Sequence, residues 1–148
     1  FNRGWHTPSW AILERTPIGA TLHFMSTELD NGDVIHQKKI EVRPCDTANS
    51  LYVKLKELEL EVFMEALPLL ISKRFLRSSL VLSEGTIHKK SELFQPEVQE
   101  IVLNEHYQAS VLIDKIRALT TNQWSESAYF ESNGKKYRLR IEIIEDER

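Results

Sequence analysis

One feature constrains the fold of this chain more than any other, a helical repeat of apolar residues between positions 51 and 66. At steps of four, three, four and four residues, the repeat consists of Leu51, Leu55, Leu58, Val62 and Ala66. This spacing places the five side chains on one face of an α-helix, where they form a stripe that faces a core. Asp46 or Thr47 is expected to cap the helix, and Pro68 to kink or end it.

The residues before this helix predict a shorter helix and two strands. Pro8 suits the first turn of a short helix, which Pro17 ends together with Gly19. Residues 20–25 (ATLHFM) are rich in β-formers, and residues 34–42 (VIHQKKIEV) predict a second strand. Between them, residues 28–33 (ELDNGD) have the Asn-Gly and Asp chemistry of a tight loop.

The second half of the chain predicts a smaller unit. A helix is expected from about residue 109 to 119, and a β-hairpin from 128–131 and 136–144 around Asn133-Gly134, a pair that favours a type I′ turn. Residues 85–90 (GTIHKK) are ambiguous in structure. We therefore predict an α/β unit over residues 1–76 and a small α+β unit, ending in the hairpin, over residues 77–148.

Composition narrows the classes of protein that fit. The chain has 148 residues, 41% of them apolar, which is enough for one domain with a core. A formal charge of −3 gives no electrostatic reason to bind nucleic acid, and no apolar run approaches the roughly 20 residues of a membrane span. With Cys45 alone no internal disulfide can form, which fits a reducing cytoplasm. The chain begins at Phe1 in a turn-like segment, so we expect a piece of a longer protein.

The stretch from residue 20 to 37 is the best candidate for chemistry, because it brings His23, Asp30, Asp33 and His36 close together around one loop. A carboxylate held between two strands can orient a neighbouring imidazole and raise its basicity. From spacing alone, however, Asp-Asn-Gly sequences more often only shape a turn.

Other chemical motifs are absent from the sequence. The five histidines have no metal-ligand spacing and there is no second cysteine, so we predict no metal. No P-loop, GxGxxG or GxSxG motif occurs. Five aromatic side chains could either stack on the flat ring of a ligand or fill a core or interface. They are Trp5, Trp10, Trp124, Tyr129 and Phe130.

The segment Gly19-Ala-Thr-Leu-His23, followed after a gap by Leu29-Asp30-Asn31-Gly32-Asp33-Val34-Ile35, resembles the signature of folate-dependent formyltransferases. The step of seven residues from His23 to Asp30, with a strand on each side, matches that pattern. The resemblance implies that the first unit is the C-terminal part of a Rossmann-like formyltransferase domain.

The flanking segments resemble one branch of this family, the sugar N-formyltransferases. Asn2-Arg3-Gly4-Trp5 resembles their NRG-type loop, and the segments at residues 85–90, 116–121, 128–130 and 134–138 resemble the C-terminal unit of enzymes that formylate dTDP-4-amino-4,6-dideoxyglucose and its relatives. The implied reaction moves a formyl group from N10-formyltetrahydrofolate to the amine of a nucleotide-linked amino-dideoxy sugar. The implied setting is the precursor synthesis of surface polysaccharides such as the lipopolysaccharide O-antigen, and the implied assembly is a homodimer.

By motif position, the resemblance assigns Asp30 as a catalytic residue and His23 as a group that orders water near it. It implies that backbone groups of Ser26, Thr27, Glu28 and Leu29 bind the pterin of the folate. It places on the nucleotide-sugar side Asn2, Arg3, Trp5, Thr86, His88, Arg117, Tyr129 and Phe130. The catalytic Asn and His of the family belong to an Asn-x-His-x-Ser-x-Leu-Pro segment, expected just before Phe1, so we expect the chain alone to be inactive.

Two alternatives stay open. One is another folate-dependent formyltransferase, such as the enzyme that acts on methionyl-tRNA, although that enzyme is expected to carry a basic C-terminal barrel. The other is a non-catalytic module that binds a nucleotide sugar or mediates dimerisation. The sequence does not choose between a C-3 and a C-4 amine, or between nucleotides.

Overall fold

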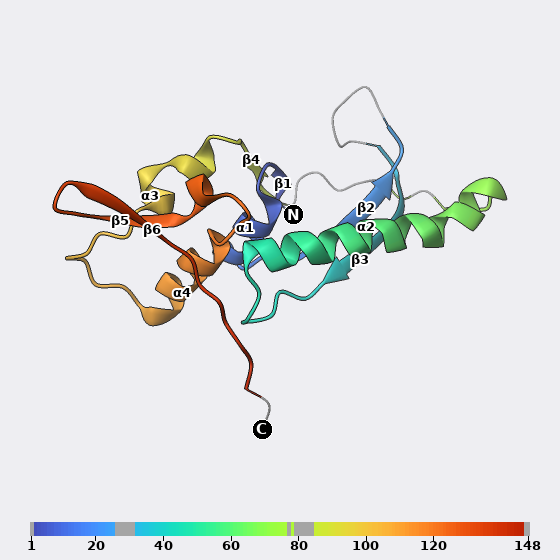
Figure 1. Ribbon diagram of the computed structural model, residues 1–148. Coiled ribbons are helices and arrows are strands. Elements are labelled where there is room, and N and C mark those ends of the chain that lie inside the picture. Colours follow the sequence, from blue (N-terminus) through green and yellow to red (C-terminus); the bar gives the residue numbers. More distant parts are fainter. Residues whose placement is uncertain (1, 26–31, 77, 79–84, 147–148) are drawn as a thin grey trace.

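The computed structural model describes residues 2–25, 32–76, 78 and 85–146. In chain order, the elements are β1 (Arg3–Gly4), α1 (Thr7–Leu13), β2 (Ile18–His23), β3 (Val34–Ile40), α2 (Ala48–Ile71), β4 (Ile87–His88), the 3-10 helix η1 (Glu92–Phe94), α3 (Pro96–Gln99), α4 (Ala109–Ala118), the 3-10 helix η2 (Trp124–Glu126), β5 (Ala128–Ser132) and β6 (Lys135–Leu139). Figure 1 shows α2 lying across the β2–β3 hairpin at one end of the molecule. The β5–β6 hairpin, α3 and α4 form the other end, and α1 lies between the two.

Helix α2 is the predicted long helix, and all five residues of its apolar stripe are buried. Thr47 caps it: its hydroxyl accepts a hydrogen bond from the Ser50 N–H at 3.2 Å, and the Ser50 hydroxyl accepts one from the Thr47 N–H at 3.1 Å. Of the two effects expected of Pro68, a kink or an end of the helix, the end does not occur at that residue, because α2 continues to Ile71. Pro68 removes one N–H donor and leaves the carbonyl of Met64 without it, and both residues are exposed to water near the end of the helix.

Strands β2 and β3 form an antiparallel hairpin whose register runs from Ile18 opposite Ile40 to His23 opposite Val34. Both strands were predicted, but β2 starts and ends two residues earlier than expected, and β3 ends two residues earlier. The hairpin packs under α2 through a core that contains Ala11, Ile18, Ala20, Leu55, Leu58 and Val62. Alternate residues of β2 therefore contact the apolar stripe, as the pleat requires.

Two further clusters join the halves of the chain. Ile12, Leu51 and Ala118 bring α1, α2 and α4 together, and Leu93, Leu119 and Ala128 fill the space between η1, α4 and β5. The division into units at residue 76 stays a prediction, and the packing of α1 on α4 crosses it. No described helix has both the length and the apolar character that a membrane span needs.

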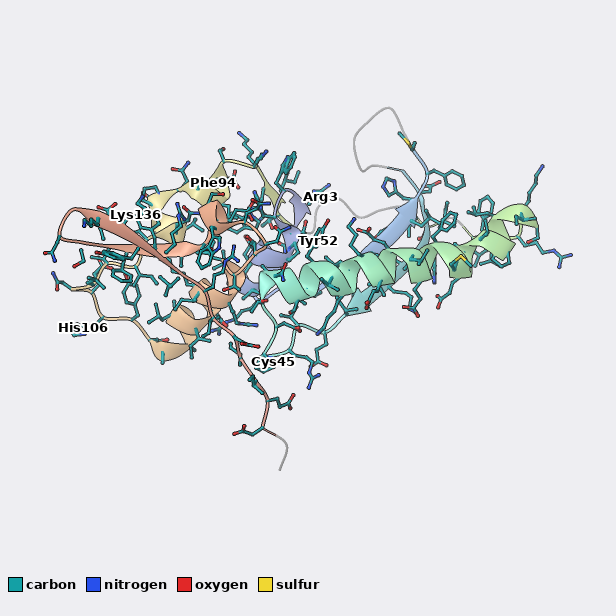
Figure 2. The ribbon with its side chains drawn as sticks, viewed as in Figure 1. Arg3, Cys45, Tyr52, Phe94, His106 and Lys136 are labelled. Atoms are coloured by element: carbon teal, nitrogen blue, oxygen red, sulfur yellow. The ribbon has the colours of Figure 1, made fainter. Side chains whose placement is uncertain are left out.

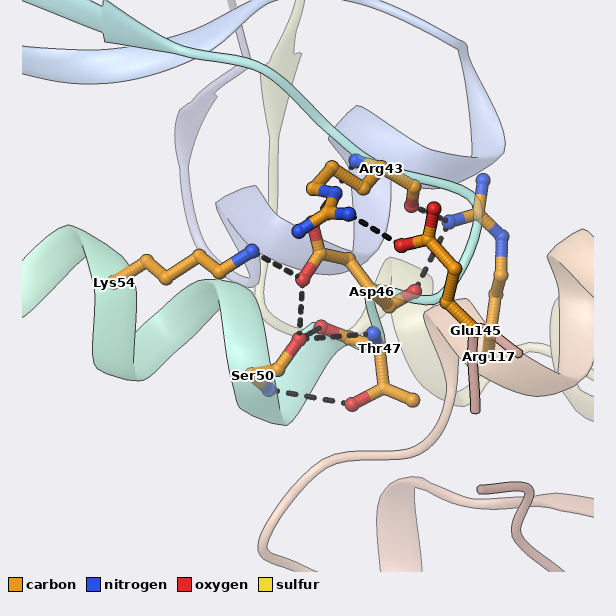
Figure 3. A network of polar contacts seen from close by, with 7 residues as sticks. All are labelled: Arg43, Asp46, Thr47, Ser50, Lys54, Arg117 and Glu145. Atoms are coloured by element: carbon orange, nitrogen blue, oxygen red, sulfur yellow. Dashed lines mark hydrogen bonds and ion pairs between the residues drawn. The ribbon is translucent and has the colours of Figure 1, made fainter. Parts of the chain in front are cut away.

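Polar contacts also tie α4 to the start of α2 (Figure 3). The buried guanidinium of Arg117 donates hydrogen bonds to the carbonyls of Arg43 at 3.1 Å and Asp46 at 3.0 Å. The Asp46 carboxylate in turn accepts hydrogen bonds from the Arg43 N–H, the Ser50 hydroxyl and the Lys54 ammonium. Burial by itself raises the pKa of Asp46, but these three hydrogen bonds outweigh it and hold the pKa below its ordinary value.

The C-terminal hairpin turns at the predicted residues. Asn133 and Gly134 have φ values of 50° and 71°, the positive values that a type I′ turn requires. Strand β6 ends at Leu139, five residues earlier than expected, because Leu139 pairs with Ala128, the first residue of β5. Beyond that point β5 offers no backbone groups to pair with.

The ambiguous segment at residues 85–90 forms a parallel pair with the start of the chain. Arg3 lies opposite Ile87 and Gly4 opposite His88, in a two-residue bridge between β1 and β4. Two backbone hydrogen bonds support it, from the Arg3 N–H to the Thr86 carbonyl at 2.9 Å and from the Trp5 N–H to the His88 carbonyl at 3.1 Å. No local pattern in the sequence predicts this pairing.

Candidate functional site

Of the residues predicted to catalyse and to bind folate, His23 ends β2, and the others lie in the sequence between β2 and β3. Residues 26–31 are outside the described residues, and they include Ser26, Thr27, Glu28, Leu29 and Asp30. The roles of these five residues stay predictions. The structure does describe the two ends of the loop, at the ends of β2 and β3.

The two ends of this loop come very close together. A Cβ atom on Gly32 would lie 1.5 Å from the carbonyl oxygen of Phe24 and 3.3 Å from Nδ1 of His23. The Phe24 N–H donates to the Asp33 carbonyl at 2.9 Å. Only glycine fits position 32, because Phe24 and Gly32 lie directly against each other.

His23 lies beside this closure. Its Nδ1 atom is 2.9 Å from the carbonyl oxygen of Phe24, and since a carbonyl only accepts, Nδ1 carries the hydrogen. In the neutral ring Nε2 then holds the lone pair. The imidazole is thus fixed at the mouth of the loop, in one tautomer, by a backbone group.

A cleft of about 390 Å³ opens elsewhere, where three segments of the chain meet. Residues 5–9 before and in α1, residues 48–59 in α2, and residues 121–126 after α4 form its walls. The volume lies within the range of small-molecule sites. The polar and aromatic residues that line it are Trp5, His6, Thr7, Ser9, Asn49, Tyr52, Lys56, Glu59, Thr121, Asn122 and Glu126.

Two aromatic rings at the cleft are well exposed, Trp5 at 55% and Tyr52 at 49%. Figure 2 shows Tyr52 near the start of α2, the end of the helix that is closer to Arg3. Lys90 places its ammonium 4.9 Å from the centre of the Trp5 ring, and Lys56 contacts Glu59 at 2.9 Å. Such rings can stack on a flat or apolar ligand face, while the lysines supply charge to hold an anion.

His6 lines the cleft and has an unusual backbone conformation. Its φ and ψ of 59° and 34° are left-handed, and its Nδ1 atom lies 3.7 Å from the Glu126 carboxylate. Nε2 is buried and finds no hydrogen-bond partner among the described residues. A buried polar nitrogen without a partner is costly, and such costs concentrate where ligands bind.

His6 is one of three residues with a positive φ value in the loop at residues 2–6. Asn2 and Gly4 also have positive φ values, 50° and 97°. A Cβ on Gly4 would lie 2.3 Å from the carbonyl oxygen of His88, so the NRG-type sequence needs its glycine for both conformation and space.

Asn2, Thr86 and His88, all predicted on the nucleotide-sugar side, come together in one cluster, in which Asn2 and His88 are buried and Thr86 is exposed. The Asn2 amide oxygen accepts hydrogen bonds from the Ala11 N–H at 3.2 Å and from the Thr16 hydroxyl, and its nitrogen donates to Glu14 at 2.8 Å and Thr86 at 2.9 Å. Arg3, between Asn2 and Gly4, lies on β1 opposite Ile87. None of these residues lines the cleft.

His88 has contacts at one ring face and at both ring nitrogens. Its ring stacks on Trp10 at 3.9 Å between centres, with an interplanar angle of 5°. Nε2 lies 3.0 Å from the Glu14 carboxylate, and Nδ1 lies 3.1 Å from the Glu92 carboxylate. The side chain is only 9% exposed, so little of it is open to a ligand.

The remaining predicted contacts lie in the second half of the chain. Arg117 is committed to Asp114 and to two backbone carbonyls. Tyr129 is 5% exposed and lies under the ammonium of Lys136 at 3.7 Å, whereas Phe130 stacks on Tyr137 at 5.4 Å. Of the predicted substrate residues, Trp5 alone lines the cleft among those that the structure describes.

Sequence reasoning missed the other wall of the cleft, where Asn49, Tyr52, Lys56 and Glu59 follow one another along α2. The available signal was Tyr52, an aromatic residue outside the apolar stripe of a helix. Within the described part of the chain, no three His, Cys, Asp or Glu side chains gather as a metal site would require.

Two family models match the chain in sequence order. The model described as "Formyl transferase" matches residues 2–67, and the model described as "N-formyltransferase dimerization C-terminal domain" matches residues 96–145. Together they include all three segments that line the cleft.

The curated relatives include two kinds of formyltransferase. The dTDP-4-amino-4,6-dideoxyglucose formyltransferase of Mycobacterium tuberculosis is 25% identical over all 148 residues, and the chain spans 62% of the length of that relative. The methionyl-tRNA formyltransferase of Colwellia psychrerythraea is 31% identical over 127 residues, which are 83% of this chain and 37% of the relative.

Solved structures confirm the predicted fold class. A 4-N formyltransferase from Francisella tularensis superposes with a TM-score of 0.86 at 29% identity, over 99% of this chain and 59% of that protein. The formyltransferase PseJ from Anoxybacillus kamchatkensis, solved with UDP-4,6-dideoxy-4-formamido-L-AltNAc and tetrahydrofolate, matches with a TM-score of 0.57 at 28% identity, over 62% of this chain and 48% of PseJ. The arrangement of helices and strands in this chain is thus that of part of a larger fold.

Proposed function

The chain belongs to the formyltransferase family, and from that membership we propose that the protein moves a formyl group from N10-formyltetrahydrofolate to the amine of a nucleotide-linked amino-dideoxy sugar. The favoured acceptor is dTDP-4-amino-4,6-dideoxyglucose, the substrate in the name of the mycobacterial relative that aligns with the whole chain. A folate donor is supported by PseJ, whose structure contains tetrahydrofolate.

The observation that carries this proposal is the composition of the cleft. Its walls come from both matched regions, Trp5 and Tyr52 from the first and Thr121, Asn122 and Glu126 from the second. Exposed aromatic faces beside lysines and amides suit a ligand that has a flat base, a charged linker and a sugar. We propose that part of the nucleotide sugar binds in this cleft.

The reaction needs a neutral amine and a stabilised oxyanion. The amine nitrogen forms a bond to the formyl carbon, and the bond from that carbon to N10 of the folate breaks as the tetrahedral intermediate collapses. The proton that leaves the amine is passed on, and N10 receives a proton as it departs. Hydrogen-bond donors aimed at the formyl oxygen lower the barrier most, because negative charge develops there.

In this scheme Asp30 orients a catalytic imidazole and helps to take the amine proton, with water as a relay. His23 orders that water from its place at the end of β2. Ser26, Thr27, Glu28 and Leu29 present backbone groups to the pterin. The sequence contains no Asn-x-His-x-Ser-x-Leu-Pro segment, so the oxyanion donors in this scheme come from outside its 148 residues.

Formyl transfer in the full encoded polypeptide tests the proposal. With N10-formyltetrahydrofolate and dTDP-4-amino-4,6-dideoxyglucose, we expect tetrahydrofolate release that depends on the sugar nucleotide. Asp30→Asn should reduce kcat by at least about a hundredfold, while Asp33→Asn, three residues away, serves as the matched control. Near-normal turnover in Asp30→Asn would remove Asp30 from the mechanism.

Two other functions remain candidates, and a specific observation favours the first of them. The first is formylation of methionyl-tRNA, which is favoured by the 31% identity to a methionyl-tRNA formyltransferase over 83% of this chain. Formylation of methionyl-tRNA in the same assay would establish it. A module that only binds nucleotide sugar or dimerises is the second, and dTDP binding without any transfer by the full polypeptide would favour it.

We also propose a homodimer formed through the C-terminal unit, whose family model carries dimerization in its description. Phe130 and Tyr137 stack on one face of the β5–β6 hairpin, and Tyr137 is 45% exposed. A second hairpin packing there would cover this apolar face. Sedimentation at tens of micromolar should give a dimer that Tyr137→Glu dissociates. The cytoplasmic location and the role in surface-polysaccharide synthesis stay predictions.

A further inference from the structure

We infer that Thr86 and His88 are positioning residues for the cleft: they hold the strained loop at residues 2–6 in the conformation that presents Trp5 and His6 to the ligand. This inference rests on the proposed function, in which the cleft binds a nucleotide sugar. It assigns both residues an action through the loop, in place of the direct contact that the family resemblance suggested. We call the contacts involved the polar joint, whose side chains are Asn2, Trp10, Glu14, Thr16, Thr86, His88 and Glu92.

The loop needs support from outside itself. Asn2, Gly4 and His6 all have positive φ values within five residues, and a non-glycine residue in that region is strained. Such a conformation persists only when surrounding contacts determine it. The five residues of the loop are too few to supply those contacts themselves.

The segment at residues 86–88 supplies that support. Its backbone accepts hydrogen bonds from the Arg3 and Trp5 N–H groups, and the Thr86 side chain bonds to the buried amide of Asn2. Gly4 approaches the His88 carbonyl so closely that even a methyl group would displace it. The backbone of residues 86–88 therefore sets the position of Arg3, Gly4 and Trp5.

His88 in turn fixes its own segment. Its ring lies between Trp10 on α1 and the carboxylates of Glu14 and Glu92, one before and one after β4 in the sequence. The Thr86 hydroxyl lies 3.0 Å from His88 Nε2 and also bonds to Glu14 at 2.9 Å. With both ring nitrogens and one ring face occupied, the imidazole acts on the loop and has no free group for a nucleotide.

Hydrogen exchange tests this in the full chain without any ligand. The Trp5 amide, bonded to the His88 carbonyl, should exchange at least about tenfold faster in Thr86→Val and in His88→Gln than in the wild type. Thr86→Ser, which keeps the hydroxyl, should restore the wild-type rate. The amide of Leu58, in the core of α2, should be unchanged in all three variants, which separates a loosened loop from a globally destabilised protein.

A double-mutant cycle on dTDP affinity tests the link to the cleft. If Thr86 acts through the loop, Thr86→Val weakens dTDP binding in the wild type but adds little to a Trp5→Ala variant, whose ring is already gone. Additive effects would mean that Thr86 contacts the ligand itself and would overturn the inference. So would an unchanged exchange rate of the Trp5 amide in both Thr86→Val and His88→Gln.

The two proposals fail in different ways. If Trp5→Ala leaves dTDP affinity unchanged, the cleft is not the nucleotide site and that part of the proposed function fails. The exchange rate of the Trp5 amide still decides whether Thr86 and His88 hold the loop.

Discussion

The contact of α2 with the β2–β3 hairpin and the polar joint hold the molecule together in opposite ways. The first buries apolar residues at regular spacing, Leu55, Leu58 and Val62 on the helix against Ile18 and Ala20 on the strand. The second buries the Asn2 amide and the His88 imidazole, which hydrogen bonds of defined length join to the hydroxyl of the exposed Thr86 and to carboxylates. Apolar packing tolerates small shifts in direction, whereas the polar joint works only in one geometry.

The two regions therefore contribute differently: apolar packing supplies the stability of the fold, and the polar joint fixes the positions of individual groups. Burial of apolar area is non-directional and supplies most of the free energy of folding. Hydrogen bonds add less to that free energy but fix the positions of the groups that make them. We therefore expect substitutions in the apolar region to lower global stability most, and substitutions at polar contacts to act more locally.

The largest effect is expected from Leu51→Ala. Leu51 is fully buried between Ile12 of α1 and Ala118 of α4, so truncation leaves a cavity and should cost about 3–5 kcal/mol of unfolding free energy. Val53→Ala, on the same helix but 52% exposed, is the control and should change stability by less than about 0.5 kcal/mol. Urea unfolding measures both, and similar costs for the two would contradict the core assignment.

Arg117→Met should follow, at about 1–3 kcal/mol, because it leaves the buried carbonyl of Asp46 without this donor and removes one of the two donors of the Arg43 carbonyl. The matched control is Arg15→Met. Arg15 binds the same Asp114 carboxylate at 2.9 Å, but its side chain is 64% exposed, so its loss should cost no more than about 0.5 kcal/mol. If both substitutions cost the same, burial does not set the value of these polar contacts.

The apolar region could be predicted because its signal is local. The stripe from Leu51 to Ala66 repeats with the period of a helix, the strands around residues 20 and 37 are rich in β-formers, and Asn133-Gly134 marks a turn by its own chemistry. The ends of the helices and strands could be predicted less well, because the neighbouring elements that pair or pack with them determine where they end. Strand β6 stops where β5 begins, and that point cannot be found within β6 itself.

The polar joint and the cleft could not be predicted in the same way. Thr86 and His88 meet Asn2 and Glu14 across more than 70 positions of the sequence. Neither segment contains a sequence pattern that predicts contact with the other. The family resemblance marked three of these four residues, yet it gave them contact with the ligand, which a motif cannot distinguish from support of the site. Tyr52 was not predicted as a site residue, because a helical period identifies only the residues that face the core.

Asp46→Asn should cost about 1–2 kcal/mol near neutral pH, and the cost should depend on pH. The hydrogen bonds that Asp46 accepts hold its folded pKa below the ordinary value of 3.8. The charged carboxylate therefore contributes stability above pH 3.8, and this contribution is lost as the pH falls through the folded pKa. Urea unfolding of both proteins from pH 7 down to pH 3 measures the difference, which should shrink only below about pH 4. A constant difference would mean that the charge of Asp46 does not matter.

The smallest effect is expected from Gly134→Ala, which changes the backbone conformational preference of the turn without changing any packing contact. A Cβ atom at this position would meet nothing within 4 Å, while φ is +71°. The cost is therefore backbone strain alone, about 1 kcal/mol in urea unfolding. Gly134→Asn should cost less than half as much, because asparagine tolerates a left-handed conformation. Equal costs for alanine and asparagine would show that the turn depends on something other than φ. At Gly4 the same change to alanine adds a clash with the His88 carbonyl to the strain, so the comparison of these two glycines separates what a turn requires by itself from what the polar joint imposes.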